Sequence, residues 1–129
     1  MELLSSFELY LPNGRFEPEA MLVNIRRLLH ERQQQGFPLG RFIAHTDWAL
    51  EDRPGVPDLA EYEARVDDLL SQHQDVVICV YDLSRFPATT IIDVIRSHPA
   101  LIIGAKLHDN PFYTAPDQLV EELRQRGHA

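Results

Sequence analysis

The chain has 129 residues, a formal net charge of −8 and a hydrophobic fraction of 44%. This length predicts one domain, residues 1–129, that can bury a core of its own. The acidic balance argues against nucleic-acid binding, which needs basic side chains to neutralise phosphates. A single cysteine allows no internal disulfide, no run of about 20 apolar residues could span a membrane, and no signal-peptide pattern opens the chain. We therefore expect a cytoplasmic protein with neither membrane nor nucleic acid as a partner.

The first third of the chain predicts an extended arm, a turn and a helix. Apolar residues alternate with polar or amphipathic ones over residues 7–11, which favours a short strand or arm, and Pro-Asn-Gly at 12–14 is typical of a turn. Pro18 stands where the first turn of a helix tolerates proline. Apolar residues then recur at helical spacing until Gly36, which predicts a helix from about 18 to 35.

The remaining chain alternates strand and helix patterns. Apolar, β-prone runs predict strands at about 39–45, 76–81 and 100–105, and amphipathic patterns predict helices at about 58–70, 87–97 and 116–126. Such alternation is typical of parallel strands joined by right-handed crossovers and covered on both faces. We therefore predict an α/β fold, a three-layer sandwich around a mainly parallel sheet.

In such a sheet, ligands bind beyond the carboxyl ends of the strands. Polar and aromatic residues that follow the three predicted strands are therefore candidate ligand-binding residues, together with two aromatic residues in the next loop. Those rings could line a small apolar pocket or simply pack over the sheet edge. The candidates are His45, Asp47, Trp48, Tyr81, Asp82, Arg85, Lys106, His108, Phe112 and Tyr113.

Two features argue against nucleotide hydrolysis and against a dedicated metal centre. Asp82 ends a strand like the acidic residue that holds magnesium in nucleotide-binding proteins, but the chain has no G-x-x-x-x-G-K-[ST] or G-x-G-x-x-G motif. The histidines and the cysteine show no spacing typical of zinc ligands. A metal held by His45, Asp47 and Asp82 is the arrangement that stays open. We assign no catalytic residue, metal or cofactor.

Three other residue groups favour structural roles. Cys79 lies in the middle of a strand, so we expect a buried thiol that reacts slowly. His98 precedes the third strand, which places it at the opposite edge of the sheet, where it would end a helix and bond nearby backbone. Acidic residues concentrate over 47–68, and we interpret them as a solvated face.

An ordered set of short motifs resembles one family. The motifs are YLPNGRFEP (10–18), HTDWAL (45–50), EYE (61–63), CVYD (79–82), RSHP (96–99) and NPFY (110–113). From about residue 9 to 116 the chain resembles the C-terminal part of the MEDS domain, the methanogen/methylotroph sensory domain of the DcmR type. The resemblance implies a RecA/KaiC-like or Rossmann-like half-domain. It also implies a role in sensing small hydrocarbon derivatives or in relaying signals beside kinase or DNA-binding modules.

The resemblance carries over no catalytic residue, and His45-Thr46 stands where a glycine-acid pair is expected. The favoured hypothesis is a non-catalytic sensory or interaction module with a small apolar ligand. The alternative is a nucleotide- or metal-binding enzyme that works at the His45/Asp82 edge. A half-domain would expose a surface that needs cover, so we expect a homodimer or a partner signalling protein.

Overall fold

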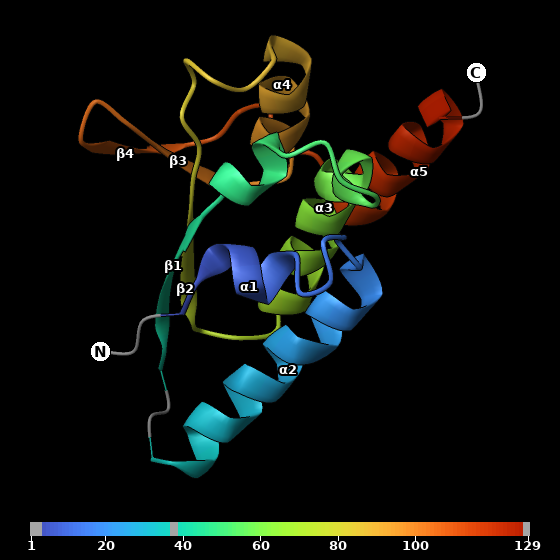
Figure 1. Cartoon of the computed structure of the whole chain (residues 1–129). Helices are drawn as coiled ribbons and strands as arrows, with labels where there is room; N and C mark the ends of the chain where they lie inside the picture. The colour runs from blue at the N-terminus through green and yellow to red at the C-terminus, as the bar shows by residue number, and fades with distance from the viewer. Residues whose placement is uncertain (1–3, 37–38, 128–129) are drawn as a thin grey trace.

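A computed structural model describes residues 4–36 and 39–127 of the chain (Figure 1). It is a mixed α/β fold in which helices predominate and the strands form small sheets. The elements, in chain order, are α1 (Ser6–Tyr10), α2 (Pro18–Gln34), β1 (Arg41–His45), the 3-10 helices η1 (Asp47–Leu50) and η2 (Val56–Asp58), α3 (Leu59–Leu70), β2 (Val76–Val80), α4 (Ala88–Arg96), β3 (Ala100–Ile103), β4 (Lys106–Asp109) and α5 (Pro116–Gly127).

The four longer helices confirm the periodicity of the sequence. Helix α2 begins at Pro18, and Gly36 follows its end with a φ of 88°, the left-handed conformation that glycine adopts most easily. Helices α3, α4 and α5 begin and end within one or two residues of the predicted positions. None of the described helices is long and apolar enough to cross a membrane.

The segment at residues 7–11 is not the extended arm that alternation predicted. It lies mostly in the short helix α1, whose N-cap residue Ser5 accepts a hydrogen bond on its hydroxyl from the Glu8 amide at 3.3 Å. A serine cap satisfies an amide that a new helix leaves without an intrahelical partner. This local bond favours one turn of helix, and no described strand pairs with the segment.

Two of the three predicted parallel strands pair as expected. Strands β1 and β2 run parallel, with Ile43 opposite Ile78 and Ala44 opposite Cys79. Side chains alternate between the two faces of a strand, so Phe42, Ala44, Val77 and Cys79 share one face, here called the inner face. Helices α1, α2 and α3 lie on one side of this pair in Figure 1.

The prediction of a third parallel strand is wrong. Strand β3 pairs antiparallel with β4 in a separate hairpin, with Ile103 opposite Lys106. Gly104 and Ala105 form the two-residue turn, and their φ values of 57° and 64° are both positive, as a type I′ hairpin turn requires. Because the chain reverses here, residues 100–105 are not one strand, and the structure does not confirm a three-layer parallel sandwich.

The core lies among the helices and the segments that join them. It contains buried side chains from the loop before α2 and from α2, η1, α3 and α4, including Phe16, Leu22, Trp48, Tyr62 and Val94. Helix α5 packs on α3, with Leu119 fully buried. Ion pairs from Arg124 to Glu61 on α3 (2.6 Å) and from Arg126 to Asp93 on α4 (2.8 Å) hold its outer side.

Candidate functional site

The carboxyl ends of β1 and β2 are tied together. The Thr46 hydroxyl donates to the carbonyl of Val80 at 2.6 Å, and Arg85 lies 3.7 Å from a carboxylate oxygen of Asp47. The loop after β2 thus meets the loop after β1, as expected for parallel strands. Asp82 is exposed, and its Oδ1 accepts from the amide and hydroxyl of Ser84 at 3.0 and 2.6 Å. These Ser84 bonds hold the pKa of Asp82 below its usual value.

Trp48 follows β1 but belongs to the core, since only 1% of its surface is exposed. Its ring stacks on Tyr10 with centroids 4.5 Å apart, and Phe16 lies against both Trp48 (4.7 Å) and Tyr62 (5.0 Å). Three of the motifs, at residues 10–18, 45–50 and 61–63, therefore supply the rings of one aromatic cluster. Packing in the core therefore explains the aromatic residues of these three motifs.

The structure separates the later candidates from this edge. Lys106 and His108 lie on β4 in the hairpin, where both are exposed. Phe112 is 69% exposed, and the hydroxyl of Tyr113 donates to Asp67 on α3. Burial and the bond to Asp67 raise the pKa of Tyr113 to about 12.

A pocket of about 410 Å³ opens beside the carboxyl ends of β1 and β2. We call it the edge pocket. Side chains from η1, η2, the start of α3, the loop after β2 and α4 line it, and most of them are apolar, such as Leu50, Val56, Leu59, Ala60 and Phe86. The polar residues that line it are Glu51, Asp52, Arg85, Thr90 and Asp93. The volume falls in the size range of small-molecule sites, and the walls combine apolar side chains with charged ones.

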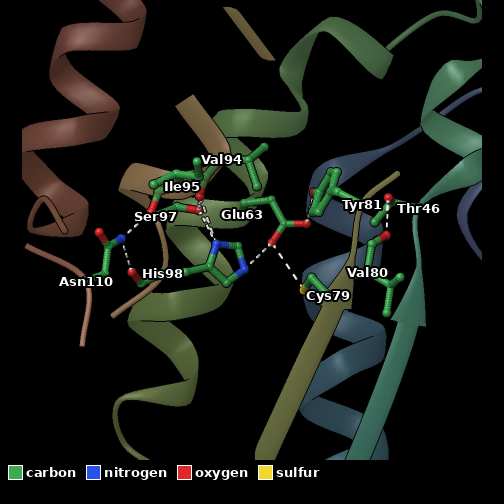
Figure 2. A network of polar contacts seen from close by, with 10 residues as sticks. All are labelled: Thr46, Glu63, Cys79, Val80, Tyr81, Val94, Ile95, Ser97, His98 and Asn110. Atoms are coloured by element: carbon green, nitrogen blue, oxygen red, sulfur yellow. Dashed lines mark hydrogen bonds and ion pairs between the residues drawn. The ribbon is translucent and has the colours of Figure 1, made fainter. Parts of the chain in front are cut away.

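A second site lies on the inner face, around the carboxylate of Glu63. Its Oε1 accepts from the Tyr81 hydroxyl at 2.9 Å, and its Oε2 lies 3.6 Å from Cys79 Sγ and 3.5 Å from His98 Nε2 (Figure 2). Helix α3, strand β2 and the two segments that follow β2 and α4 bring these residues together. We call Glu63, Cys79, Tyr81 and His98 the Glu63 cluster.

Burial controls the electrostatics of the Glu63 cluster. The side chain of Glu63 is 5% exposed, and burial raises its pKa, while His98, Tyr81 and Cys79 partly offset that rise. The pKa of Cys79 is raised by burial and by the Glu63 carboxylate, and the pKa of Tyr81 rises well above its usual value for the same two reasons. Without another bound group, the thiol and the phenol stay protonated near neutral pH and donate to Glu63.

The backbone around His98 is fixed by a set of short bonds. His98 Nδ1 lies 2.8 Å from the Val94 carbonyl, and the Ser97 hydroxyl donates to the same carbonyl at 2.7 Å. Asn110 is buried, and its side-chain amide donates to the carbonyls of Ile95 and His98, both at 2.7 Å. The motifs RSHP and NPFY therefore meet as one unit that positions the imidazole.

Sequence patterns missed the Glu63 cluster. The prediction that His98 bonds nearby backbone is confirmed. The prediction that it lies at the opposite edge of the sheet is wrong, because β3 is not in that sheet and the other nitrogen of His98 faces Glu63, which contacts Tyr81 just after β2. The interpretation of the acidic run as a solvated face is wrong at Glu63. A helical projection would have identified it, because Glu63 follows Leu59 by four residues and precedes Val66 by three, on the buried side of α3. Among the described residues, this group, and not His45, Asp47 and Asp82, has the geometry of metal ligands.

Comparison with known proteins gives one family. No curated protein and no solved structure matches the chain significantly. The family model described as MEDS, methanogen/methylotroph, DcmR sensory domain, matches residues 1–99. The match covers all the motifs except NPFY. The motifs predicted a range of 9–116, whereas the match begins before residue 9 and ends before residue 116. The match supports the domain but not its restriction to a C-terminal part. The chain belongs to the MEDS family of sensory domains.

Proposed function

We propose that this chain is a non-catalytic sensory and regulatory module that recognises a small apolar compound in the edge pocket. The observation that carries the proposal is the pocket itself, whose lining is mostly apolar and lies at the carboxyl ends of a parallel strand pair. Family membership supports the sensory role. Arg85 and its Asp47 partner would mark the polar side of the site, and the cytoplasm is the proposed compartment.

A thermal-shift screen on the purified chain tests the ligand class. Small halogenated and aliphatic compounds should raise the melting temperature in a saturable way, since a ligand that binds only the folded state stabilises it. The variant Ala60→Trp fills the edge pocket and should abolish the shift. Val23→Trp, at an exposed position of α2, is the matched control and should keep it. Equal shifts in both variants would reject the edge pocket as the site.

The alternative, a nucleotide- or metal-binding enzyme at the His45/Asp82 edge, predicts a different result in the same screen. Magnesium with a nucleotide would then stabilise the chain, and Asp82→Ala would remove the effect. The bonds from Ser84 favour a loop-capping role for Asp82. We therefore expect no stabilisation by magnesium nucleotide and no ATP or GTP hydrolysis.

We further propose that the module passes on its state through the face of the β1–β2 pair opposite to the inner face, here called the outer face. It carries Ile43, Val76, Ile78 and Val80, all exposed, with Ile43 at 68%. A second copy of the chain is the proposed cover, because twofold pairing lets one apolar patch cover itself.

Light scattering over a wide concentration range tests this association. The wild type should show the mass of a dimer at high concentration, and Ile43→Lys should show a monomer throughout. Val23→Lys changes an equally exposed apolar residue on α2 and should dimerise like the wild type. A wild type that stays monomeric at all concentrations would reject self-association. Dimers formed by Ile43→Lys would move the contact away from the outer face.

A further inference from the structure

The Glu63 cluster contains three different kinds of metal-binding side chain. Glu63, Cys79 and His98 each offer one ligand atom, and these atoms all lie within 4.8 Å of one another. Figure 2 shows the Glu63 carboxylate between the Cys79 thiol and the His98 imidazole, with a dashed line to each. The mechanism proposed for the edge pocket makes no use of them.

Two of the three spacings between the ligand atoms match tetrahedral zinc, and the third pair, Cys79 Sγ and His98 Nε2, lies within 4.8 Å. Zinc binds sulfur at about 2.3 Å and nitrogen or oxygen at about 2.0–2.1 Å, so neighbouring ligand atoms of a tetrahedral site lie about 3.3–3.6 Å apart. The distances from Glu63 Oε2 are 3.6 Å to Cys79 Sγ and 3.5 Å to His98 Nε2. The ligand set excludes magnesium and calcium, which prefer oxygen, because thiolate and imidazole favour zinc and related transition metals.

The contact of His98 with the Val94 carbonyl leaves its other ring nitrogen directed to Glu63. The Val94 carbonyl can only accept, so its 2.8 Å contact places an imidazole hydrogen on Nδ1. Nε2 is then the ring nitrogen that faces Glu63 Oε2, 3.5 Å away. Donation from the second ring nitrogen to a carbonyl is the usual support of a metal-bound histidine.

The surroundings suit an ion with one open position. Tyr81 donates to Glu63 Oε1 and so orients the carboxylate, while Ser97 and Asn110 fix the backbone of the histidine. The side chain of His98 is 23% exposed, which gives the site contact with solvent. Three protein ligands leave the fourth tetrahedral position for an external group, as in zinc sites that bind small molecules.

We propose that Glu63, Cys79 and His98 form a binding site for one zinc ion, with the fourth position open to water or a small donor ligand. The ion would cross-link α3, β2 and the end of α4, and it would take the place of the thiol hydrogen of Cys79. This inference does not depend on the edge pocket, because no residue of the Glu63 cluster lines that pocket.

Cobalt(II), which replaces zinc and is coloured, tests the site on the full chain after treatment with a chelator. Because Cys79 is the single cysteine, any thiolate-to-cobalt absorption in the near ultraviolet reports on this residue. We expect that absorption to saturate at one cobalt per chain and to disappear when zinc is added. Cys79→Ser should lose it, and His98→Gln and Glu63→Gln should each weaken binding about tenfold or more. The control His108→Gln changes an exposed histidine of β4 and should bind as the wild type does.

Two outcomes would overturn the proposal: no thiolate absorption with cobalt in excess, or undiminished affinity in both His98→Gln and Glu63→Gln. X-ray absorption of the zinc-loaded wild type needs no variant and covers the case in which a substitution unfolds the chain. A spectrum that shows one sulfur together with nitrogen and oxygen atoms bound to the zinc supports the site. A spectrum that shows no sulfur bound to the zinc rejects it.

Discussion

The two faces of the β1–β2 pair invert the usual distribution of polar and apolar groups. The inner face is covered by helices, yet Cys79 meets a buried carboxylate and an imidazole there. In the part of the chain that the structure describes, the outer face is exposed to solvent, yet its exposed side chains include the apolar residues Ile43, Ile78 and Val80. The difference teaches that burial on this strand pair does not follow polarity, and the two proposals account for it: a bound ion on the inner face and a second copy of the chain on the outer face.

The prediction with the largest expected effect on stability compares neighbouring residues on the inner and outer faces of β2. Val77→Asp places a short charged side chain on the partly buried inner face and should destabilise the chain by about 2 kcal/mol, because a charge removed from water without a partner is costly. Ile78→Asp places the same group on the outer face. At low concentration, where any dimer has dissociated, it should change the free energy of unfolding by about 0.5 kcal/mol or less. Urea denaturation measures both.

If Ile78→Asp proved as damaging as Val77→Asp at every concentration, the outer face would be part of the core of a single chain. If instead its cost appeared only as protein concentration rises, the outer face would be an interface between copies. The concentration series thus separates folding from association at one position.

The second test concerns the bonds that hold His98 in place. Asn110→Ala leaves the carbonyls of Ile95 and His98 without their donor and should cost about 2 kcal/mol, the penalty for buried polar groups that lose a partner. Asp109→Ala, at the exposed neighbouring position, should change stability by about 0.5 kcal/mol or less. Equal losses in the two variants would show that the Asn110 side chain is not what fixes this segment.

The third test uses two tyrosines that make the same kind of bond at different depths. Tyr81 donates to the buried Glu63, and Tyr113 donates to Asp67 at the surface. Tyr81→Phe should cost about 1.5 kcal/mol, because the buried carboxylate loses a donor that water cannot replace. Tyr113→Phe should cost about 0.5 kcal/mol or less, since water can solvate Asp67. A larger loss from Tyr113→Phe would contradict the burial argument.

Local sequence patterns predicted much of the fold, because individual helices and strands are determined largely by residues that are close in sequence. Helical periodicity and Pro18 place α2, and the apolar run at 76–81 places β2 parallel to β1. The apolar run does not predict whether both faces of the β1–β2 pair are covered, since coverage depends on segments that are distant in sequence. The apolar lining of the edge pocket also comes from several segments distant in sequence.

The candidate site was less predictable than the fold. Glu63, Cys79 and His98 are too far apart in sequence for any ligand-spacing motif, and their meeting depends on how α3 and α4 pack on β2. The expected convergence of Lys106 and His108 on the strand ends failed for one local reason, the turn at Gly104. Glycine inside an apolar run is a known sign of such a break.

The smallest expected effect concerns the turn at Gly104 and Ala105, which joins β3 to β4. Ala105 has a φ of 64°, and the left-handed conformation costs a residue with a Cβ about 1 kcal/mol. Ala105→Gly removes that strain but loosens the unfolded chain by about 0.5 kcal/mol, so stability should rise by about 0.5 kcal/mol. Gly104→Ala, at a φ of 57°, should instead cost about 1 kcal/mol. Thermal unfolding of the two variants against the wild type measures these opposite signs. A loss in Ala105→Gly as large as that in Gly104→Ala would show that residue 105 is not strained.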